Sequence, residues 1–176
     1  MEEIKPELRM YFFVPYNIMP IQKGIQAGHC AEQYAYKYRN DPEWEKYVTE
    51  FKTWIILNGG TMNDSPIIEV RGSMDQLLDQ VKESGIKYAT FNEPDLNNGL
   101  SAICFICDEK VFDKKNYPYY EDWAAEEIYN RTHRNGVRLG IHVTMPDEPT
   151  DEYIELIGGE QNMFKKELIR NQRLAV

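Results

Sequence analysis

The chain has 176 residues, of which 42% are hydrophobic, and a formal net charge of −9. This length fits one domain with room for an appended tail, and the hydrophobic fraction is enough to fill a core. The sequence contains no apolar run of the roughly 18 residues that cross a bilayer. Residues 1–6 lack the basic and apolar segments of a signal peptide, so we expect a cytoplasmic protein with no membrane partner.

The acidic charge argues against broad attraction to nucleic acid, which needs a basic face, but it permits a local basic site. Charge is also segregated late in the sequence. Residues 147–160 carry six acidic side chains and no Lys or Arg, whereas residues 162–176 carry four basic side chains and one acidic one. Such segregation is typical of a solvated surface, although the basic end could contact phosphates.

The three cysteines are an odd number and do not suggest a disulfide framework. Cys104 and Cys107 have C-x-x-C spacing in a strand-like run, where residues three apart point to opposite faces and cannot easily share a metal. We expect these two residues and Cys30 to be buried, reduced thiols. No cofactor or metal site is expected.

In the first part of the chain, a strand is predicted over residues 8–14 and a helix from Pro20, which suits a first helical turn. The helix residues expected to face a sheet recur at spacings of three and four: Ile25, Gly28, Ala31, Ala35 and Tyr38. A neighbouring stripe is polar and consists of Gln22, Gln26, His29 and Gln33. A second helix is predicted from Asp41 and Pro42, an N-cap followed by a first-turn proline.

A second strand is predicted over residues 53–57, and residues 67–70 favour a short extended segment. The capping-box pattern Ser73–Gln76 predicts a helix that ends at Gly85. Two more strands are predicted over residues 87–91 and 102–106. This order of strands and helices indicates an α/β layer with a mixed sheet.

The last third of the chain is predicted to contain a helix over residues 118–134, a strand over residues 137–143 and a terminal helix over residues 163–174. His142 and Thr144 would form a His-x-Thr pattern on that strand. Phosphoesterases that use this pattern need two copies, and the sequence contains one. The pattern therefore carries no assignment.

Two segments could carry chemistry. The loop between the strands at 87–91 and 102–106 holds two carboxylates, Glu93 and Asp95, beside several amides. It is either a turn built on proline and Asn-Gly geometry or a site held by two rigid strands. The helix start near Pro20 could bind an anion through its free N–H groups and Lys23, or Lys23 could simply face solvent. His29 is either a base or donor, or a structural histidine.

The order of elements and four segments resemble the type 2 peptidyl-tRNA hydrolase superfamily, in particular its divergent branch in phages and bacterial mobile elements. The resemblance spans Leu8 to Asp113, about two-thirds of the chain. Its markers are Ile21–Ala31, where the family has a Lys/Gly-rich turn that opens a helix; the helix start Asp41–Glu43; the segment Thr53–Thr61; and the loop Phe91–Ile103, where the parent family carries Asp-x-Gly-x-Thr before its last strand.

The resemblance implies a three-layer α/β sandwich over residues 1–115, with a mixed four-stranded sheet and helices on both faces. Residues 116–176 would form a C-terminal extension. It also implies a hydrolase that cleaves, without a metal, the ester joining a peptide to the 3′ ribose of tRNA. The partner would then be tRNA or another RNA 3′ end. The oligomeric state stays open, a homodimer included.

The same resemblance implies roles for individual residues. Lys23 takes the place of the family's lysine, Glu93 or Asp95 that of its aspartate, and Asn97 that of its threonine. Ser101 is the substitute hydroxyl. The other residues expected to bind substrate are Gln22, Gln26, His29, Asn58 and Asn98.

Two alternatives remain on the same fold. One is a non-catalytic phage accessory module that binds RNA, a nucleotide or a protein, which the altered family positions and the net charge of −9 favour. The other is a hydrolase for a different ester or amide, with the loop carboxylates kept as the base.

Overall fold

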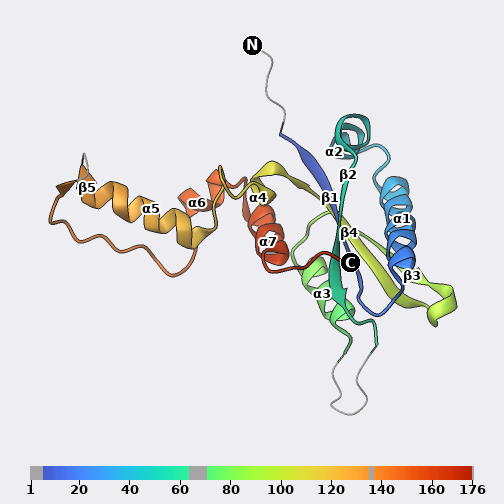
Figure 1. The fold of residues 1–176 in the computed structure, drawn as a ribbon. Helices are drawn as coiled ribbons and strands as arrows, with labels where there is room; N and C mark the ends of the chain where they lie inside the picture. The colour runs from blue at the N-terminus through green and yellow to red at the C-terminus, as the bar shows by residue number, and fades with distance from the viewer. Residues whose placement is uncertain (1–5, 64–70, 135–136, 176) are drawn as a thin grey trace. The chain divides into compact units, whose positions relative to one another are not determined.

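The structure, a computed structural model, describes residues 6–63, 71–134 and 137–175 (Figure 1). The chain divides into two compact units. The first comprises residues 1–109 together with 167–176, and the second comprises residues 110–166. The C-terminal residues therefore belong to the same unit as the sheet. Among the described residues, no helix is both long and apolar enough to cross a bilayer.

The first unit is built on a four-stranded mixed sheet with the order β2-β1-β4-β3. Its strands are β1 (Leu8–Pro15), β2 (Thr53–Gly60), β3 (Ala89–Glu93) and β4 (Gly99–Asp108). β1 is parallel to β2 and antiparallel to β4, and β3 is antiparallel to β4. The α/β fold with a mixed four-stranded sheet is thus confirmed, and the central place of β1 explains its buried apolar run from Met10 to Pro15.

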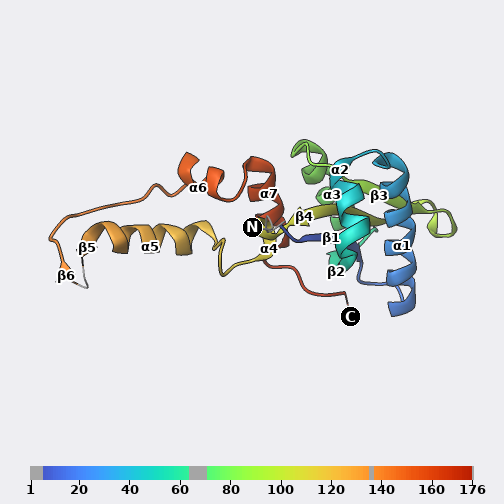
Figure 2. The same ribbon diagram turned by 90° about the horizontal axis from the view of Figure 1, so that it is seen from above.

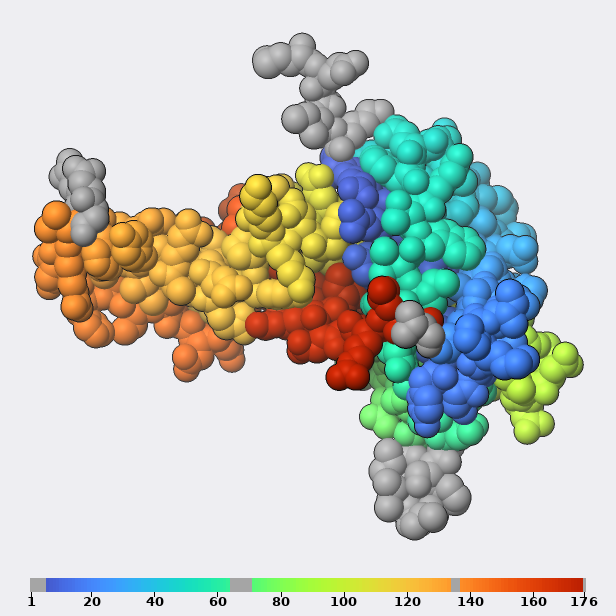
Figure 3. Space-filling view, viewed as in Figure 1, coloured from blue at the N-terminus to red at the C-terminus, as the bar shows by residue number. Residues whose placement is uncertain are grey.

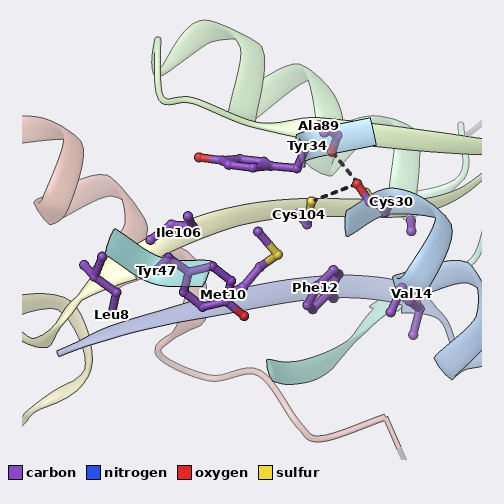
Figure 4. Packing of buried hydrophobic residues seen from close by; sticks show 12 residues of the cluster. Leu8, Met10, Phe12, Val14, Cys30, Tyr34, Tyr47, Ala89, Cys104 and Ile106 are labelled. Atoms are coloured by element: carbon purple, nitrogen blue, oxygen red, sulfur yellow. Dashed lines mark hydrogen bonds between the residues drawn. The ribbon is translucent and has the colours of Figure 1, made fainter. Parts of the chain in front are cut away.

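Helices cover both faces of this sheet. On one face α1 (Pro20–Lys37) packs through Ala27, Cys30 and Tyr34 against alternate residues of β1 and β4 (Figure 4). The β1 residues that take part are Met10, Phe12 and Val14. The intervening residues of β1 point to the other face because side chains alternate along a strand. There Phe13 and Met74, from α3 (Ser73–Glu83), both lie against Gly59.

The face of α1 that meets the sheet differs from the one predicted. Ile25 is 48% exposed, whereas the buried residues are Lys23, Gln26, Ala27, Cys30 and Tyr34. The prediction counted only apolar and small residues as core. Two polar side chains belong to the buried face because they have partners inside the protein, which hydrophobic periodicity does not register.

The cysteines lie where they were expected. Cys30, Cys104 and Cys107 are buried and free. Figure 4 shows the Cys30 thiol donating to the Ala89 carbonyl at 3.4 Å, and the Cys104 thiol donating to the Cys30 carbonyl at 3.6 Å. Burial raises the pKa of Cys104, which keeps this sulfur protonated.

Two helix starts were predicted from capping patterns, with different outcomes. The Asp41 carboxylate accepts from the Glu43 amide at 2.9 Å, so it caps α2 (Pro42–Lys46) as expected. A π-helical turn, η1 (Tyr47–Phe51), follows α2. The capping box at Ser73 is wrong: Gly72 is the N-cap, and the Ser73 hydroxyl accepts instead from the Thr61 amide at 2.7 Å. The extended segment predicted at 67–70 lies outside the described residues.

The terminal helix α7 (Glu160–Ile169) begins and ends earlier than predicted. The residues after it pair with the open edge of β2. The Asn58 amide donates to the Arg173 carbonyl at 2.9 Å, and the Ala175 amide donates to the Ile56 carbonyl at 3.0 Å. These two bonds add a short antiparallel segment to the sheet beside β2.

The second unit is mostly helical and has a small aromatic core. Its elements after α4 (Glu109–Phe112) are α5 (Tyr120–Thr132), β5 (His133–Arg134), β6 (Val137–Arg138) and α6 (Asp151–Leu156). Tyr120, Trp123 and Tyr153 pack together, with ring centroids 5.2 to 6.0 Å apart. The strand predicted over 137–143 is wrong beyond Arg138, so His142 and Thr144 lie on no strand.

The basic end of the chain is not only a solvated surface. Lys166 is 1% exposed. Its ammonium donates to the carbonyls of Lys110, Val111 and Tyr117 at 3.3, 3.2 and 2.7 Å. This lysine therefore ties α4 to the segment that follows it rather than facing an external phosphate.

Candidate functional site

Helix α1 and strand β3 lie side by side and run in opposite directions (Figures 1 and 2). Successive contacts along them show this arrangement. Gln26 bonds to Glu93, the His29 ring packs on Phe91, the Cys30 thiol donates to Ala89, and Lys37 donates to the Tyr88 carbonyl. Consequently the loop after β3 lies beside the first turns of α1, as the space-filling view shows (Figure 3).

A buried hydrogen-bond chain joins the helix, the loop and β4. Ser101 Oγ donates to Gln26 Oε1 at 2.7 Å and also lies 3.1 Å from the Phe91 carbonyl. Gln26 Nε2 donates to Glu93 Oε2 at 2.6 Å. Gln26 and Ser101 are almost fully buried, at 4% and 0% exposed. Both ends of the Gln26 amide are therefore bonded: Oε1 is held by Ser101, and Nε2 holds the Glu93 carboxylate.

Lys23 belongs to the same part of α1. It precedes Gln26 by three residues, which places both side chains on one face of the helix. It is only 6% exposed, so the solvent-facing alternative is wrong. The structure thus puts a buried cation one helical turn from the residue that holds Glu93. Gln22 has a local role, because its Oε1 accepts from the Met19 amide at 3.1 Å at the helix start.

The loop itself is a tight turn with an exposed polar surface. Glu93 Oε1 accepts from the Asp95 amide at 3.4 Å and begins the short helix η2 (Pro94–Leu96). Asn97 and Asn98 both adopt left-handed backbone conformations, with φ of 52° and 58°, which asparagine tolerates better than most residues. The Asp95, Asn97 and Asn98 side chains are exposed. A ligand bound at this loop could therefore contact these three side chains.

His29 borders this group and is partly accessible. Its ring centroid lies 4.7 Å from that of Phe91, and its side chain is 45% exposed. Nδ1 lies 3.8 Å from a Glu32 carboxylate oxygen, a pair that is ionic only when the imidazole is protonated. One face of the imidazole therefore packs on Phe91, while part of the ring stays accessible to solvent.

Asn58 lies elsewhere. It is on β2, separated from β3 in the sheet by β1 and β4, and its Oδ1 accepts from the Gly60 amide at 2.8 Å. It lines a cavity of about 400 Å³ together with Gly59, Ser73 and Gln76. Of the residues expected in the site, hydrogen bonds join Gln26, Glu93 and Ser101, and Lys23 lies one helical turn before Gln26 on α1. His29 packs on the neighbouring Phe91, and Asp95, Asn97 and Asn98 follow Glu93 in the loop.

One part of the site was missed. Phe91 supplies both the ring under His29 and a carbonyl within reach of Ser101. Its position two residues before Glu93 on the same strand is the signal that could have found it, since residues i and i+2 share a face of a strand. The shared face joins this ring to the carboxylate beside α1.

The arrangement holds the Glu93 carboxylate through Gln26, with the buried Lys23 one helical turn from Gln26 and exposed amides in the same loop. Such a set can activate water, stabilise an oxyanion or bind a polar ligand. Within the described residues, no group of three or more His, Cys, Asp or Glu side chains could hold a metal ion. Compared with models of known protein families the chain matches none, and no curated protein is significantly similar to it.

Proposed function

We propose that this chain hydrolyses the ester between a peptide and the 3′ ribose of cytoplasmic tRNA, as a divergent relative of the type 2 peptidyl-tRNA hydrolases. The observation that carries the proposal is the hydrogen-bond chain from Ser101 through Gln26 to Glu93, one helical turn from the buried Lys23. It supplies an oriented base and a cation without requiring a metal.

In this mechanism Glu93 is the general base. Its carboxylate takes a proton from a water molecule while the water oxygen attacks the ester carbonyl carbon. The carbonyl oxygen becomes an oxyanion, which Lys23 stabilises. The bond between the carbonyl carbon and the ribose oxygen then breaks, and Glu93 returns its proton to that oxygen. The products are a tRNA 3′ hydroxyl and a peptide carboxylic acid, which then loses its proton to solvent.

Ser101 is a positioning residue in this mechanism. Its hydroxyl is fully buried and donates to Gln26, so it is not free to attack the substrate. Holding Gln26 Oε1 aims Nε2 at Glu93. Water rather than a protein hydroxyl is therefore the nucleophile. The exposed amides of Asn97 and Asn98, with the edge of His29, would bind the ribose and the ester.

The assignment is tested by comparing two carboxylates of the same loop. Glu93→Gln keeps the shape and the bond from Gln26 but removes the base. We expect kcat for a peptidyl-tRNA substrate to fall about 100-fold or more. Asp95→Asn should retain most of the activity, because the Asp95 side chain is exposed and Glu93 accepts from its main-chain amide. The reverse result would move the base to Asp95, and unchanged turnover in both variants would refute carboxylate catalysis.

The second candidate is a binding module that holds an RNA end without cleaving it. It is favoured by the hydrogen bonds that Gln26 and Ser101 make within the protein. These bonds hold the polar residues of the site rigidly, and a rigid polar surface suits recognition as well as catalysis. An assay of binding and turnover at low and moderate salt separates the two functions. Salt-sensitive binding with no turnover would support the module, whereas turnover that depends on Glu93 would support the hydrolase.

A further inference from the structure

A second pocket lies at the opposite end of the contact between α1 and β3. It has a volume of about 350 Å³ and is lined by Gln33, Tyr36, Lys37, Tyr88, Ala89 and Thr90. A neighbouring cavity of about 300 Å³ shares Lys37 and includes Arg39. Volumes of this size are in the range of small-ligand sites, which begins at about 300 Å³.

The lining combines one exposed and one half-buried tyrosine ring with a lysine, and an arginine lines the neighbouring cavity. Tyr36 is 73% exposed, an unusual state for a large aromatic side chain. Lys37 Nζ lies 4.7 Å from the centroid of the Tyr88 ring and 5.1 Å from that of Tyr38. The Arg39 guanidinium lies 5.4 Å from the centroid of the Tyr36 ring. These contacts hold two positive charges beside aromatic faces in a chain of net charge −9.

The acidic residue that lines the neighbouring cavity does not cancel this charge. Asp41 lines the neighbouring cavity, but its carboxylate is paired with Lys87 at 2.6 Å. Lys37 donates to the Tyr88 carbonyl at 3.1 Å. An ammonium carries three donors, so this bond leaves donors for a ligand. The pocket therefore offers flat aromatic surface and cationic donors together.

These features match single-stranded nucleic acid more closely than other ligands. Exposed tyrosines stack on bases whatever their sequence, and adjacent Lys and Arg contact the phosphates. This pocket and the site at Glu93 also lie along the same helix, α1. Gln26 and Lys37 are eleven residues apart on α1, or about 16 Å along the helix axis, which is a span of several nucleotides. β3, which joins them, is an edge strand of the sheet.

We propose that the pocket at Tyr36, Lys37 and Tyr88 binds a base and a phosphate of the single-stranded RNA 3′ end, a few nucleotides before the ester held at Glu93. This inference rests on the proposed function for the direction of the RNA. The pocket would be a second subsite, so that the protein recognises several nucleotides of the RNA and not only the one that carries the ester. The subsite contributes to binding and not to the chemical step.

The test compares a long and a short substrate. Tyr36→Ala and Lys37→Gln are assayed on a peptidyl-tRNA and on a peptidyl-adenosine that carries the same ester. We expect kcat/KM on the tRNA substrate to fall about tenfold in each variant, through KM, because Tyr36→Ala removes a stacked base and Lys37→Gln removes a phosphate contact. Activity on peptidyl-adenosine should not change. Matched controls are Tyr129→Ala and Lys82→Gln, an exposed tyrosine and an exposed lysine that do not line the pocket.

Equal losses on both substrates, or no loss on either, would overturn the subsite. If the wild-type protein cleaves neither substrate, the proposed function fails, and the pocket is then tested by binding alone. A fluorescent single-stranded RNA with the tRNA 3′ sequence should bind the wild type and bind Tyr36→Ala and Lys37→Gln about tenfold more weakly. Absence of wild-type binding, or equal binding by the variants, would refute the subsite.

Discussion

Gln26 Nε2 donates to Glu93 Oε2 over 2.6 Å, and this bond joins the first helix to a loop 67 residues later in the chain. The donor is almost fully buried and its other end is held by Ser101. A charge-assisted bond of this length is stronger than a neutral one and resists rotation of the carboxylate. The Glu93 carboxylate is therefore presented to any ligand of the loop in one fixed orientation.

Gln26→Glu should turn this contact into a repulsion that depends on pH. Two facing carboxylates cannot both ionise easily, so the pKa of one of them rises above its unfolded value. The penalty is present above that raised pKa and disappears as pH falls and a shared proton restores the bond. At pH 7 we expect the free energy of unfolding to drop by about 2 to 4 kcal/mol.

Urea unfolding at several pH values measures this effect, with Gln80→Glu as the control. Gln80 is an exposed residue of α3, so its substitution adds the same charge at a position where solvent screens it. A Gln26→Glu deficit that stays constant between pH 7 and pH 4 would contradict the proposed pairing with Glu93.

Two glycines should respond oppositely to alanine. Gly60 has φ of +91°, and an added Cβ there would collide with the Ser73 hydroxyl, which holds the Thr61 amide. Gly60→Ala should therefore cost at least about 1 kcal/mol. Gly28 lies inside α1 with open space around its Cβ position. Gly28→Ala should raise stability by about 0.5 to 1 kcal/mol, since alanine is the better helix former. Thermal unfolding of both variants compares them directly, and stabilisation by Gly60→Ala would show that β2 ends differently.

The sheet was predictable because its signals are local. The apolar residues of β1 and of the two strands around the loop indicate by themselves that these strands are buried. In the structure β1 lies at the centre of the sheet, between β2 and β4. The pairing of Arg173 and Ala175 with β2 was not predictable, because it uses only main-chain groups. The alternation over 137–143 failed for the converse reason: the pattern is present, but pairing ends at Arg138.

The site was predictable only as a region. The loop at Glu93 stood out by composition and by position between two strands. The hydrogen bonds through Gln26 and Ser101 could not be predicted, because each bond joins residues far apart in the sequence. From the sequence alone, each of these polar side chains would be expected at the surface. Lys23 and Gln26 are buried only because the fold supplies them with partners or shielding, a property of the tertiary structure.

Asp41→Asn should reveal an ion pair in the pH dependence of stability. The hydrogen bond from Lys87 holds the pKa of Asp41 below its ordinary value. Stability from a lowered carboxylate pKa is fully present above the unfolded pKa of about 3.9 and is lost as pH falls through the folded value. Asparagine keeps the helix cap but loses the ion pair.

We expect Asp41→Asn to cost less than about 1 kcal/mol at pH 7, because solvent screens this partly exposed pair, and to cost progressively less below about pH 4. Chemical denaturation of the variant and the wild type between pH 7 and pH 3 gives both values. Lys87→Gln is the matched variant and should cost slightly more, because Lys87 Nζ also lies 3.6 Å from a Glu43 carboxylate oxygen. The double variant should show no further loss. Additive losses would show that the two side chains act separately.

Lys166→Met should loosen the part of the chain after β4, within residues 110–166. The ammonium satisfies three main-chain carbonyls, those of Lys110, Val111 and Tyr117, and methionine fills similar space without a donor. Leaving buried acceptors unpaired should cost about 2 to 4 kcal/mol. Hydrogen exchange of amides between residues 110 and 117 should speed up accordingly, because the segment opens more often. Lys115→Met, at an exposed position in the same segment, should change exchange by less than about 0.5 kcal/mol. Equal exchange in the two variants would mean that the three carbonyls find other donors and that Lys166 is not what orders the segment after α4.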